Sequence, residues 1–357
     1  MRFALSEDQV LLQDSLTKAL AELAPLERVR RFADEAEPSA PDIWAGLTEL
    51  GLPGLLIPEA YGGLGLTLVE AALAAQALGR AAAPTPFLGS TVLAPLALTT
   101  AGTEAQQADL LPKLAAGELT AAVAIHEPVA GARDGAGVTA KDGKLTGRAL
   151  FAIGAGGADL LIVADRTGAL HLARQAHVIE AMTTIDATQQ VTEISFRDTP
   201  AEPLISNGAL ERLRDAAWTM IAADTLGACD AMLEKAVAYA KERRQFGRVI
   251  GSFQAVKHLC AEMAAEIEPA RALVWYAAYA FDHAPEEASL MAAHAKAHTS
   301  EIGRFVARTA TEVHGGIGIT DLLGLHYWFK RIGLNRQLLG GPERVRDTAA
   351  RLQGLAA

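Results

Sequence analysis

The sequence has few of the residues that mark disulfide-linked, metal-binding or nucleic-acid-binding proteins. Its 357 residues include only two cysteines, Cys229 and Cys260. Because both lie in apolar helical patterns, we expect buried free thiols and no disulfide or metal site. The net charge is −10 and no basic run is present. Since phosphate backbones are bound by clustered Lys and Arg, this balance excludes nucleic acid as the main partner.

Long apolar runs are also missing. The sequence contains no stretch of 18 apolar residues, so it predicts no transmembrane helix and no membrane partner. The N-terminal segment begins Met1-Arg2-Phe3 and soon turns amphipathic, without the apolar core of a signal peptide. We therefore expect a cytoplasmic protein.

What the sequence has in abundance favours a large helical protein. Half of the residues are apolar, 21% are charged and only 5% are aromatic. The apolar residues include a great many alanines, which favour helix. A chain of this length exceeds the usual size of one hydrophobic core, so two or three packed units are expected.

The first third of the chain has the start and stop signals of helices. Ser6 and Gln9 form a capping-box pattern before an apolar run. Pro41 opens a second helix, and Gly51 ends it. Thr67 opens a long Ala-rich helix. The helical part is expected to end near residue 118, which gives an N-terminal helical domain over residues 1–118.

A change of pattern near residue 119 predicts a β domain over residues 119–205. Short apolar or alternating runs at 122–125, 160–164 and 191–196 are typical of strands, and Lys141-Asp142-Gly143-Lys144 is a hairpin turn signal. From about residue 207 apolar residues recur at helical spacing again, for example at Met263 and Ile267. We therefore expect an α+β protein with a C-terminal helical domain over residues 206–357.

Two segments of the last domain are specific enough to indicate a family. One reads Arg243-Arg244-Gln245-Phe246-Gly247, and the other reads Glu312-Val313-His314-Gly315-Gly316. In this order and separation they resemble the acyl-CoA dehydrogenases, and the resemblance covers nearly the whole chain. It implies the fold of that family, with an N-terminal helical domain, a middle β-barrel-like domain and a C-terminal four-helix bundle.

In that family the two segments of one subunit reach across a dimer interface to the pyrophosphate and adenine end of FAD, which lies mainly on the neighbour. Arginine offers a forked donor for pyrophosphate, and paired glycines let a ligand approach the backbone closely. Taken singly, such an arginine is usually solvated and a Gly-Gly pair is usually a turn, but the ordered set favours the flavin interpretation. The family usually has Gln where this chain has Glu312. The implied FAD contacts are Arg243, Phe246, Phe253, Gln254, Glu312, Gly315 and Gly316.

The catalytic base of the family is missing. Its reaction needs a carboxylate to remove the α-proton of an acyl-CoA thioester. The family keeps this glutamate in one of two positions, which fall here on Ala217 and on Gly340 of the turn Leu339-Gly340-Gly341-Pro342. Neither residue can accept a proton. Four acidic residues nearby are expected to be surface or cap residues rather than substitutes: Glu211, Asp215, Asp224 and Glu343.

The middle domain also lacks residues that the family uses in its reaction. The family's Thr-Glu-Pro loop reads His126-Glu127-Pro128 here, and its flavin-facing hydroxyl is absent from Phe151-Ala152-Ile153-Gly154. The resemblance is therefore to the shorter, non-catalytic subunit of bacterial α2β2 steroid-type acyl-CoA dehydrogenases. This implies that the chain completes a shared FAD site, while a catalytic partner supplies the glutamate and binds the acyl-CoA. Two alternatives stay open: an active homomer with a displaced base such as Glu343, and a structural partner that binds no flavin.

Overall fold

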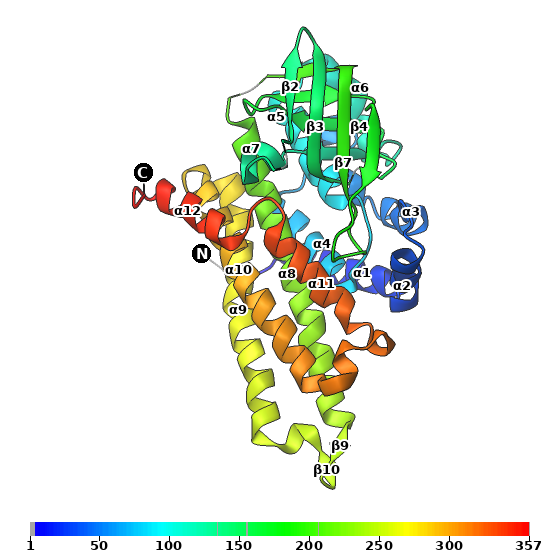
Figure 1. The fold of residues 1–357 in the computed structure, drawn as a ribbon, viewed down its shortest axis with the longest axis vertical. Coiled ribbons are helices and arrows are strands. Elements are labelled where there is room, and N and C mark those ends of the chain that lie inside the picture. The colour runs from blue at the N-terminus through cyan, green and yellow to red at the C-terminus, as the bar shows by residue number, and fades with distance from the viewer. Residues whose placement is uncertain (1–3, 134, 155, 206, 357) are drawn as a thin grey trace.

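The computed structural model describes residues 4–133, 135–154, 156–205 and 207–356, so Met1-Arg2-Phe3 lies outside the described residues. Figure 1 shows a β sheet at one end of the molecule, N-terminal helices beside it, and long C-terminal helices that run to the opposite end. The expected order of helices, sheet and helices is confirmed. None of the helices in these ranges is long and apolar enough to cross a membrane.

The N-terminal helices begin where the sequence predicts. The capping box at α1 is formed, with the Gln9 N–H donating to Ser6 Oγ at 3.2 Å. Thr67 and Glu70 form a second capping box at α4. The elements are α1 (Glu7–Leu23), α2 (Leu26–Asp34), α3 (Pro41–Glu49), η1 (Leu52–Gly54), η2 (Glu59–Tyr61), α4 (Leu68–Ala81), η3 (Leu88–Leu93), α5 (Ala94–Ala101) and α6 (Glu104–Ala115).

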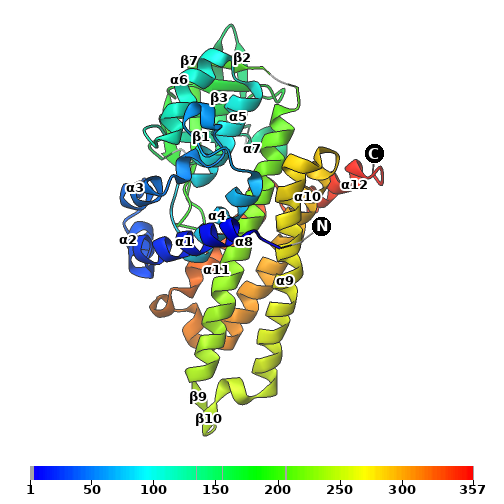
Figure 2. The ribbon, with the colours of Figure 1, turned by 180° about the vertical axis from the view of Figure 1, so that it is seen from behind.

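The middle part is an eight-stranded sheet in the order β6-β7-β3-β1-β4-β5-β8, with β2 paired to β3. Only the β1–β4 pair is parallel among the pairings of this sheet in the described chain. The predicted hairpin is confirmed, since Lys141 pairs with Lys144. Figure 2 shows α5 and α6 in front of the sheet. The elements are β1 (Ala121–Ala124), α7 (His126–Ala130), β2 (Gly137–Lys141), β3 (Lys144–Ile153), β4 (Leu160–Ala164), β5 (Leu170–Ala173), β6 (Val178–Ala181), β7 (Val191–Pro200) and β8 (Glu202–Leu204).

The C-terminal helices are unusually long. The 34 residues of α8 correspond to a rod of about 51 Å at 1.5 Å per residue. One end of α8 therefore meets the sheet, and the other carries the β9–β10 hairpin at the far tip of the molecule (Figure 1). The elements are α8 (Ala209–Glu242), β9 (Arg244–Gln245), β10 (Arg248–Val249), η4 (Ile250–Ser252), α9 (Gln254–His283), α10 (Pro285–His314), η5 (Gly315–Ile319), η6 (Asp321–Leu323), α11 (Leu325–Gln337) and α12 (Pro342–Leu352).

One expectation for this helical part needs correction. Cys229 is buried, but Cys260 is only half-buried. The apolar residues Met263, Ile267 and Val274 of α9 are buried within the chain. Because α9 packs on α8 and α10, its apolar stripe is already used inside the subunit.

A close helix crossing holds α4 to α8. A Cβ atom added at Gly227 would lie 1.9 Å from the Gln76 carbonyl oxygen, and one added at Gly79 would lie 2.0 Å from the Asp224 carbonyl oxygen. The two backbones therefore touch at a distance that only glycine permits. This crossing joins the N-terminal helices firmly to the long helix on which the site is built.

We predict that Gly227→Ala lowers the free energy of unfolding by about 1–3 kcal/mol, because the new methyl group must push α4 away from α8. Thermal or urea unfolding measures the change. Gly316→Ala is the matched control, since a Cβ there meets no atom within 4 Å. Equal stability of the two variants would contradict the close crossing.

Candidate functional site

The tip of the molecule carries the first of the two predicted FAD-binding segments. Arg243 ends α8 as its C-cap and is exposed, and the β9–β10 hairpin follows directly. Phe246 lies at the turn of this hairpin with φ 53° and is 91% exposed. Its ring meets the Phe253 ring edge-on at 6.1 Å between centroids, and Arg248 lies 4.0 Å from the Phe253 centroid. The segment thus presents a cationic and aromatic surface to solvent.

The second segment lies at the same end of the molecule. The rings of Tyr239 on α8 and His314 on α10 stack with 4.8 Å between their centroids. The chain then turns at Gly315, which has φ 62° and therefore suits glycine. Glu312, Gly315 and Gly316 are exposed. The structure therefore brings the ends of α8 and α10, and with them the two motifs, side by side.

His314 has a structural place in this arrangement. It is buried, and Nδ1 lies 2.7 Å from the Ala310 carbonyl oxygen. Burial lowers the pKa of His314, so the neutral ring is favoured. The contacts of the ring therefore have a structural role, since they join α10 to α8.

The groups at this tip fit the phosphate and sugar end of FAD. Among the described residues no hydrogen bond or ion pair engages the Arg243 guanidinium, which is available for a bidentate contact to phosphate. Gln254 is exposed at the first position of α9, a helix of 30 residues whose N-cap, Phe253, makes no side-chain cap. The first N–H groups of such a helix attract anions. The Glu312 carboxylate can accept hydrogen bonds from ribose hydroxyls.

The segments that contain the two predicted base positions meet toward the opposite end of α8. The indole Nε1 of Trp218 donates to the Leu339 carbonyl oxygen at 2.9 Å, which joins the α8 residue beside Ala217 to the residue beside Gly340. Ala217 and Trp218 are buried, and the Arg214 guanidinium lies 4.9 Å from the Trp218 ring. The two segments are thus adjacent in space, and neither carries a carboxylate at its predicted base position.

The acidic residues near this junction are engaged elsewhere or point to solvent. The expectation that Asp215 and Asp224 are surface or cap residues is wrong. Asp215 is buried and accepts hydrogen bonds from Arg214 at 2.8 Å and from Ser289. Asp224 forms an ion pair with Arg331 at 2.6 Å. Such buried carboxylates are retained because they are paired.

Glu343, the substitute base considered for a homomer, lies in the first turn of α12 on the surface. It is exposed and accepts a hydrogen bond from Arg336 at 3.2 Å. Its own backbone N–H, followed by the Arg336 charge, lowers the pKa of this carboxyl. An exposed carboxyl with a lowered pKa is a poor proton acceptor at neutral pH. Glu211 is exposed in the first turn of α8.

His126 is a buried residue that the sequence did not single out. The segment His126-Glu127-Pro128, which the family resemblance assigns to a loop, lies in the short helix α7, where Pro128 is tolerated because it lies in the first turn. His126 is 5% exposed, and its ring lies 4.6 Å from the Phe151 ring. Neither ring nitrogen has a partner within the part of the chain that the structure describes. Burial, followed by the charges of Arg133 and Arg344, lowers the pKa of His126 to about 4.

This pKa predicts a loss of stability in mild acid. Between about pH 4 and 6.5 the unfolded chain binds a proton at His126 that the folded chain does not, so the free energy of unfolding falls as the pH falls. From pH 7 to 5.5 we expect roughly 1 kcal/mol of loss from this residue. His126→Phe should remove that part of the pH dependence in urea unfolding. An identical slope in the variant would contradict the prediction.

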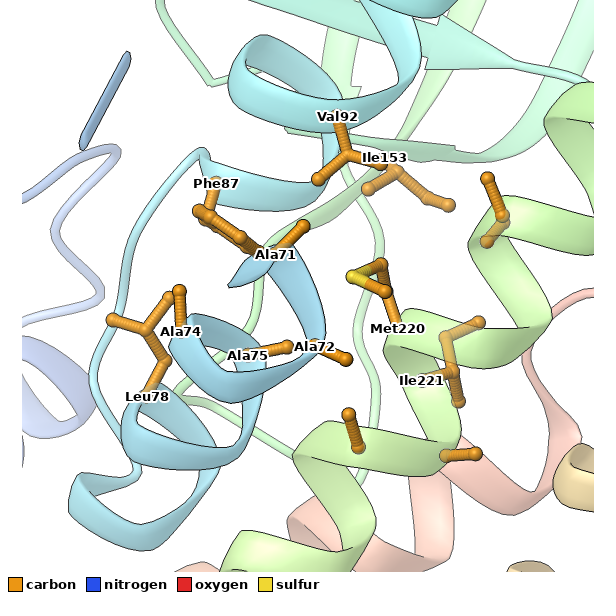
Figure 3. Packing of buried hydrophobic residues seen from close by; sticks show 14 of the residues in the cluster. Ala71, Ala72, Ala74, Ala75, Leu78, Phe87, Val92, Ile153, Met220 and Ile221 are labelled. Carbon is orange, nitrogen blue, oxygen red and sulfur yellow. The ribbon is translucent and has the colours of Figure 1, made fainter. Parts of the chain in front are cut away.

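A cavity of about 210 Å³ lies between α3, α4 and α8. Figure 3 shows Ala75 of α4 between Leu78 on one side and Met220 and Ile221 of α8 on the other, with Phe87 and Ile153 above them. The polar side of the cavity is formed by the ion pair of Asp224 and Arg331 together with Thr188, Gln189 and Gln190. No local sequence pattern indicates this cavity, because its walls come from segments far apart in the chain.

The described residues show no group of three or more His, Cys, Asp or Glu side chains that could hold a metal ion.

The predicted FAD contacts cluster at one end of the molecule. The cavity lies toward the middle of the molecule, and the segments with the predicted base positions meet where Trp218 of α8 contacts Leu339.

Comparisons with known proteins place these features in a family. The family model described as "Acyl-CoA dehydrogenase, N-terminal domain" matches residues 6–118. The model described as "Acyl-CoA dehydrogenase, C-terminal domain" matches residues 209–353. The acyl-CoA dehydrogenase IpdE2 of Mycolicibacterium smegmatis is 32% identical over 348 residues, which cover 97% of this chain and 99% of that protein. IpdE2 of Mycobacterium tuberculosis is 33% identical over 340 residues, 95% of each.

Solved structures give the same result. A variant of the Tcur3481-Tcur3483 steroid ACAD has a TM-score of 0.88 at 29% identity, with 98% of each chain covered. The ChsE4-ChsE5 complex from Mycobacterium tuberculosis has a TM-score of 0.92 at 24% identity over 100% of each chain, a likeness that concerns the fold alone.

Proposed function

Because the chain belongs to the acyl-CoA dehydrogenase family, we propose that it is the FAD-site-completing subunit of a heteromeric member of that family. In this proposal a catalytic partner supplies the glutamate, holds the isoalloxazine ring and binds the acyl-CoA. FAD, when bound, accepts the hydride that leaves the acyl chain. This chain contributes Arg243, Phe246 and Gln254 to the other end of the cofactor.

The observation that carries the proposal is the junction of Trp218 and Leu339. It joins the segments that contain Ala217 and Gly340, and neither of these two residues, which the family resemblance aligns with a base, is a carboxylate. Desaturation requires a positioned base with a pKa suited to the task. Within the described structure Asp215 and Asp224 form ion pairs with Arg214 and Arg331. In this proposal another subunit therefore removes the proton.

The length of α8 supports a shared cofactor. Arg243 follows Ala217 by 26 residues of helix, which is about 39 Å at 1.5 Å per residue. This separation exceeds the length of an extended FAD molecule. A single copy of the chain therefore does not bring its tip and its own base positions to one flavin. The tip residues are suited to an FAD that lies on another subunit.

Exposed apolar side chains in this half of the molecule favour a protein partner there. Phe246 is 91% exposed at the tip, and Ile319 and Leu322, on the segment between α10 and α11, are 76% and 75% exposed. Several large exposed apolar side chains on one part of a surface are typical of interaction sites. We infer that the partner covers this end of the helices in an α2β2 assembly.

The substrate class we infer is an acyl-CoA thioester derived from a steroid side chain. The similarity to a steroid ACAD supports the steroid origin, and the similarity to two acyl-CoA dehydrogenases, the IpdE2 proteins, supports the thioester. The thioester would be bound by the partner, since the base must lie beside its α-carbon.

Expression alone and together with the catalytic partner tests the proposal. We predict that the chain alone is poor in FAD and reduces no electron acceptor with any acyl-CoA. The co-expressed complex should contain two FAD per α2β2 tetramer and be active. Native mass and the flavin absorbance of the complex measure the stoichiometry.

The alternatives give different results in the same experiment. A yellow, active homomer would overturn the proposal and make Glu343 the first residue to replace. Four FAD per tetramer would show that this subunit has a working site of its own. A complex whose FAD content does not depend on this chain would favour a structural partner that binds no flavin.

A further inference from the structure

The segment between α10 and α11 carries two exposed apolar side chains. It spans residues 315–324 and comprises η5 and η6. Ile319 is 76% exposed and Leu322 is 75% exposed. Figure 1 shows this segment on the same side of the molecule as α2. Two large apolar side chains so close in the sequence give the segment a surface that is suited to contact with another protein.

The position of these side chains in the chain indicates what covers them. The 3-10 helix η5 runs from Gly315 to Ile319 and rises about 2 Å per residue, so Ile319 lies within about 8 Å of Gly315 along its axis. In the proposed function Gly315 and Gly316 meet an FAD that lies on the catalytic partner. A subunit that holds the cofactor at these glycines must also come against Ile319. The catalytic partner is therefore the occupant of this surface.

The segment is anchored by α2, which is far away in the sequence. Arg30 Nη2 donates to the Asp321 carbonyl oxygen at 2.8 Å. The same oxygen accepts from the Gly324 N–H at 3.0 Å, which closes the turn of η6. Leu26 packs on Gly324, where an added Cβ would lie 2.9 Å from Leu26 Cδ1. Because residues i and i+4 share a helix face, one face of α2 contacts the segment on both sides of Leu322.

Arg30 contacts the backbone of the segment rather than the Asp321 carboxylate. Its Nε lies 3.6 Å from one carboxylate oxygen, and His326 Nε2 lies 3.6 Å from the other. Both distances are too long for a hydrogen bond, and the Asp321 side chain is 66% exposed. Exposed ion pairs of this kind contribute little to stability. The hydrogen bond to the carbonyl oxygen is therefore the contact that fixes the path of the chain beside Leu322.

We propose that the segment 315–324 recognises the catalytic partner and that Arg30 is its positioning residue. Arg30 does not touch the partner. It holds the Asp321 carbonyl oxygen and so presents Leu322 and Ile319 in one orientation. A segment that is ordered in advance loses less conformational freedom when the partner binds, which stabilises the complex. The inference rests on the proposed function and adds a role of the N-terminal helices in assembly.

The rate at which the assembled complex dissociates tests the proposal, because changes at an interface act mainly on dissociation. Exchange of labelled full-length chain measures this rate, with the acyl-CoA dehydrogenase chain used for co-expression as the partner. Arg30→Met should speed dissociation about 2- to 10-fold, the effect of one hydrogen bond. Arg30→Lys should restore most of the loss, since a carbonyl oxygen needs only one donor.

Arg31→Met is the matched control. It removes the same charge from the same helix, but Arg31 lies 3.5 Å from Glu37 and is 54% exposed. Since its ion pair lies within the N-terminal helices, the rate should stay within about 2-fold of wild type.

A double variant separates positioning from a general loss of stability. Leu322→Ala removes a side chain that the partner covers, so it should speed dissociation about 10-fold or more. If Arg30 acts by placing Leu322, then Arg30→Met should have a clearly smaller effect in the Leu322→Ala background than in wild type. If Arg30→Met only weakens the fold, the two effects should multiply.

Three results would overturn the proposal. They are equal dissociation of Arg30→Met and Arg31→Met, effects that multiply in the double variant, and a Leu322→Ala complex that dissociates like wild type. Any of them, in a complex whose FAD affinity still depends on Arg243, overturns this inference and leaves the shared FAD site standing. A chain that forms no complex with the partner overturns both.

Discussion

Arg243→Ala is expected to lower the FAD affinity of the assembled complex roughly 10- to 100-fold, the effect of losing a charge-assisted contact to phosphate. The variant should still fold, because only the backbone of Arg243 takes part in the local structure. Its N–H donates to the Tyr239 carbonyl oxygen at 2.9 Å, and its carbonyl oxygen accepts from the Ile250 N–H at 2.8 Å. FAD titration of the purified complex measures the change.

Two further variants sharpen this test. Arg243→Lys should restore only part of the affinity, since an ammonium group cannot reproduce the forked geometry of guanidinium. Arg351→Ala is the control for loss of charge alone, because Arg351 is an exposed residue of α12 paired with Asp347 at 2.9 Å. Arg248 is a poorer control, as it lies against the Phe253 ring. Equal FAD affinity of Arg243→Ala and wild type would favour the structural partner that binds no flavin.

The features that the sequence predicted well depend on neighbouring residues. The capping box of Ser6 and Gln9 involves three consecutive peptide units, and the hairpin at Lys141 and Lys144 needs only the turn between them. The family motifs added the overall order of helices and sheet. The domain boundaries at residues 118 and 205 and the FAD contacts stay predictions.

The features that the sequence missed depend on residues far apart in the chain. Asp224 looked like a surface residue because its partner, Arg331, lies on a different helix. The contact of Trp218 with the Leu339 carbonyl oxygen crosses from α8 to the 338–341 turn. His126 is buried by β3 and Phe151 rather than by its own segment. Burial of a polar residue is decided by tertiary packing, which local patterns do not record.

The ion pair of Arg331 and Asp224 leads to the largest stability effect that we expect. Arg331 is 4% exposed and joins α11 to α8, to Thr188 of the sheet region and to the Ala83 carbonyl oxygen. Removing one partner of a buried pair leaves the other charge without compensation, which typically costs about 3–5 kcal/mol. We therefore expect Arg331→Met to lower the free energy of unfolding by that amount.

Removing Arg331 should also affect a second buried carboxyl group nearby. Asp186 is fully buried, and burial raises its pKa to about 6, although the Arg331 charge acts in the opposite direction. Without Arg331 the ionised form of Asp186 becomes still less favourable, so Arg331→Met should be destabilised more at pH 8 than at pH 5 relative to wild type.

Urea unfolding of three variants tests this prediction. Lys330→Met is the matched control, because Lys330 is the exposed neighbour of Arg331 on α11, and surface changes of this kind stay within about 0.5 kcal/mol. In the double variant Asp224→Leu with Arg331→Met the Asp224 carboxylate is no longer left unpaired, so part of the loss should return, while the effect on Asp186 remains. If Arg331→Met unfolds like Lys330→Met, the ion pair contributes nothing to stability.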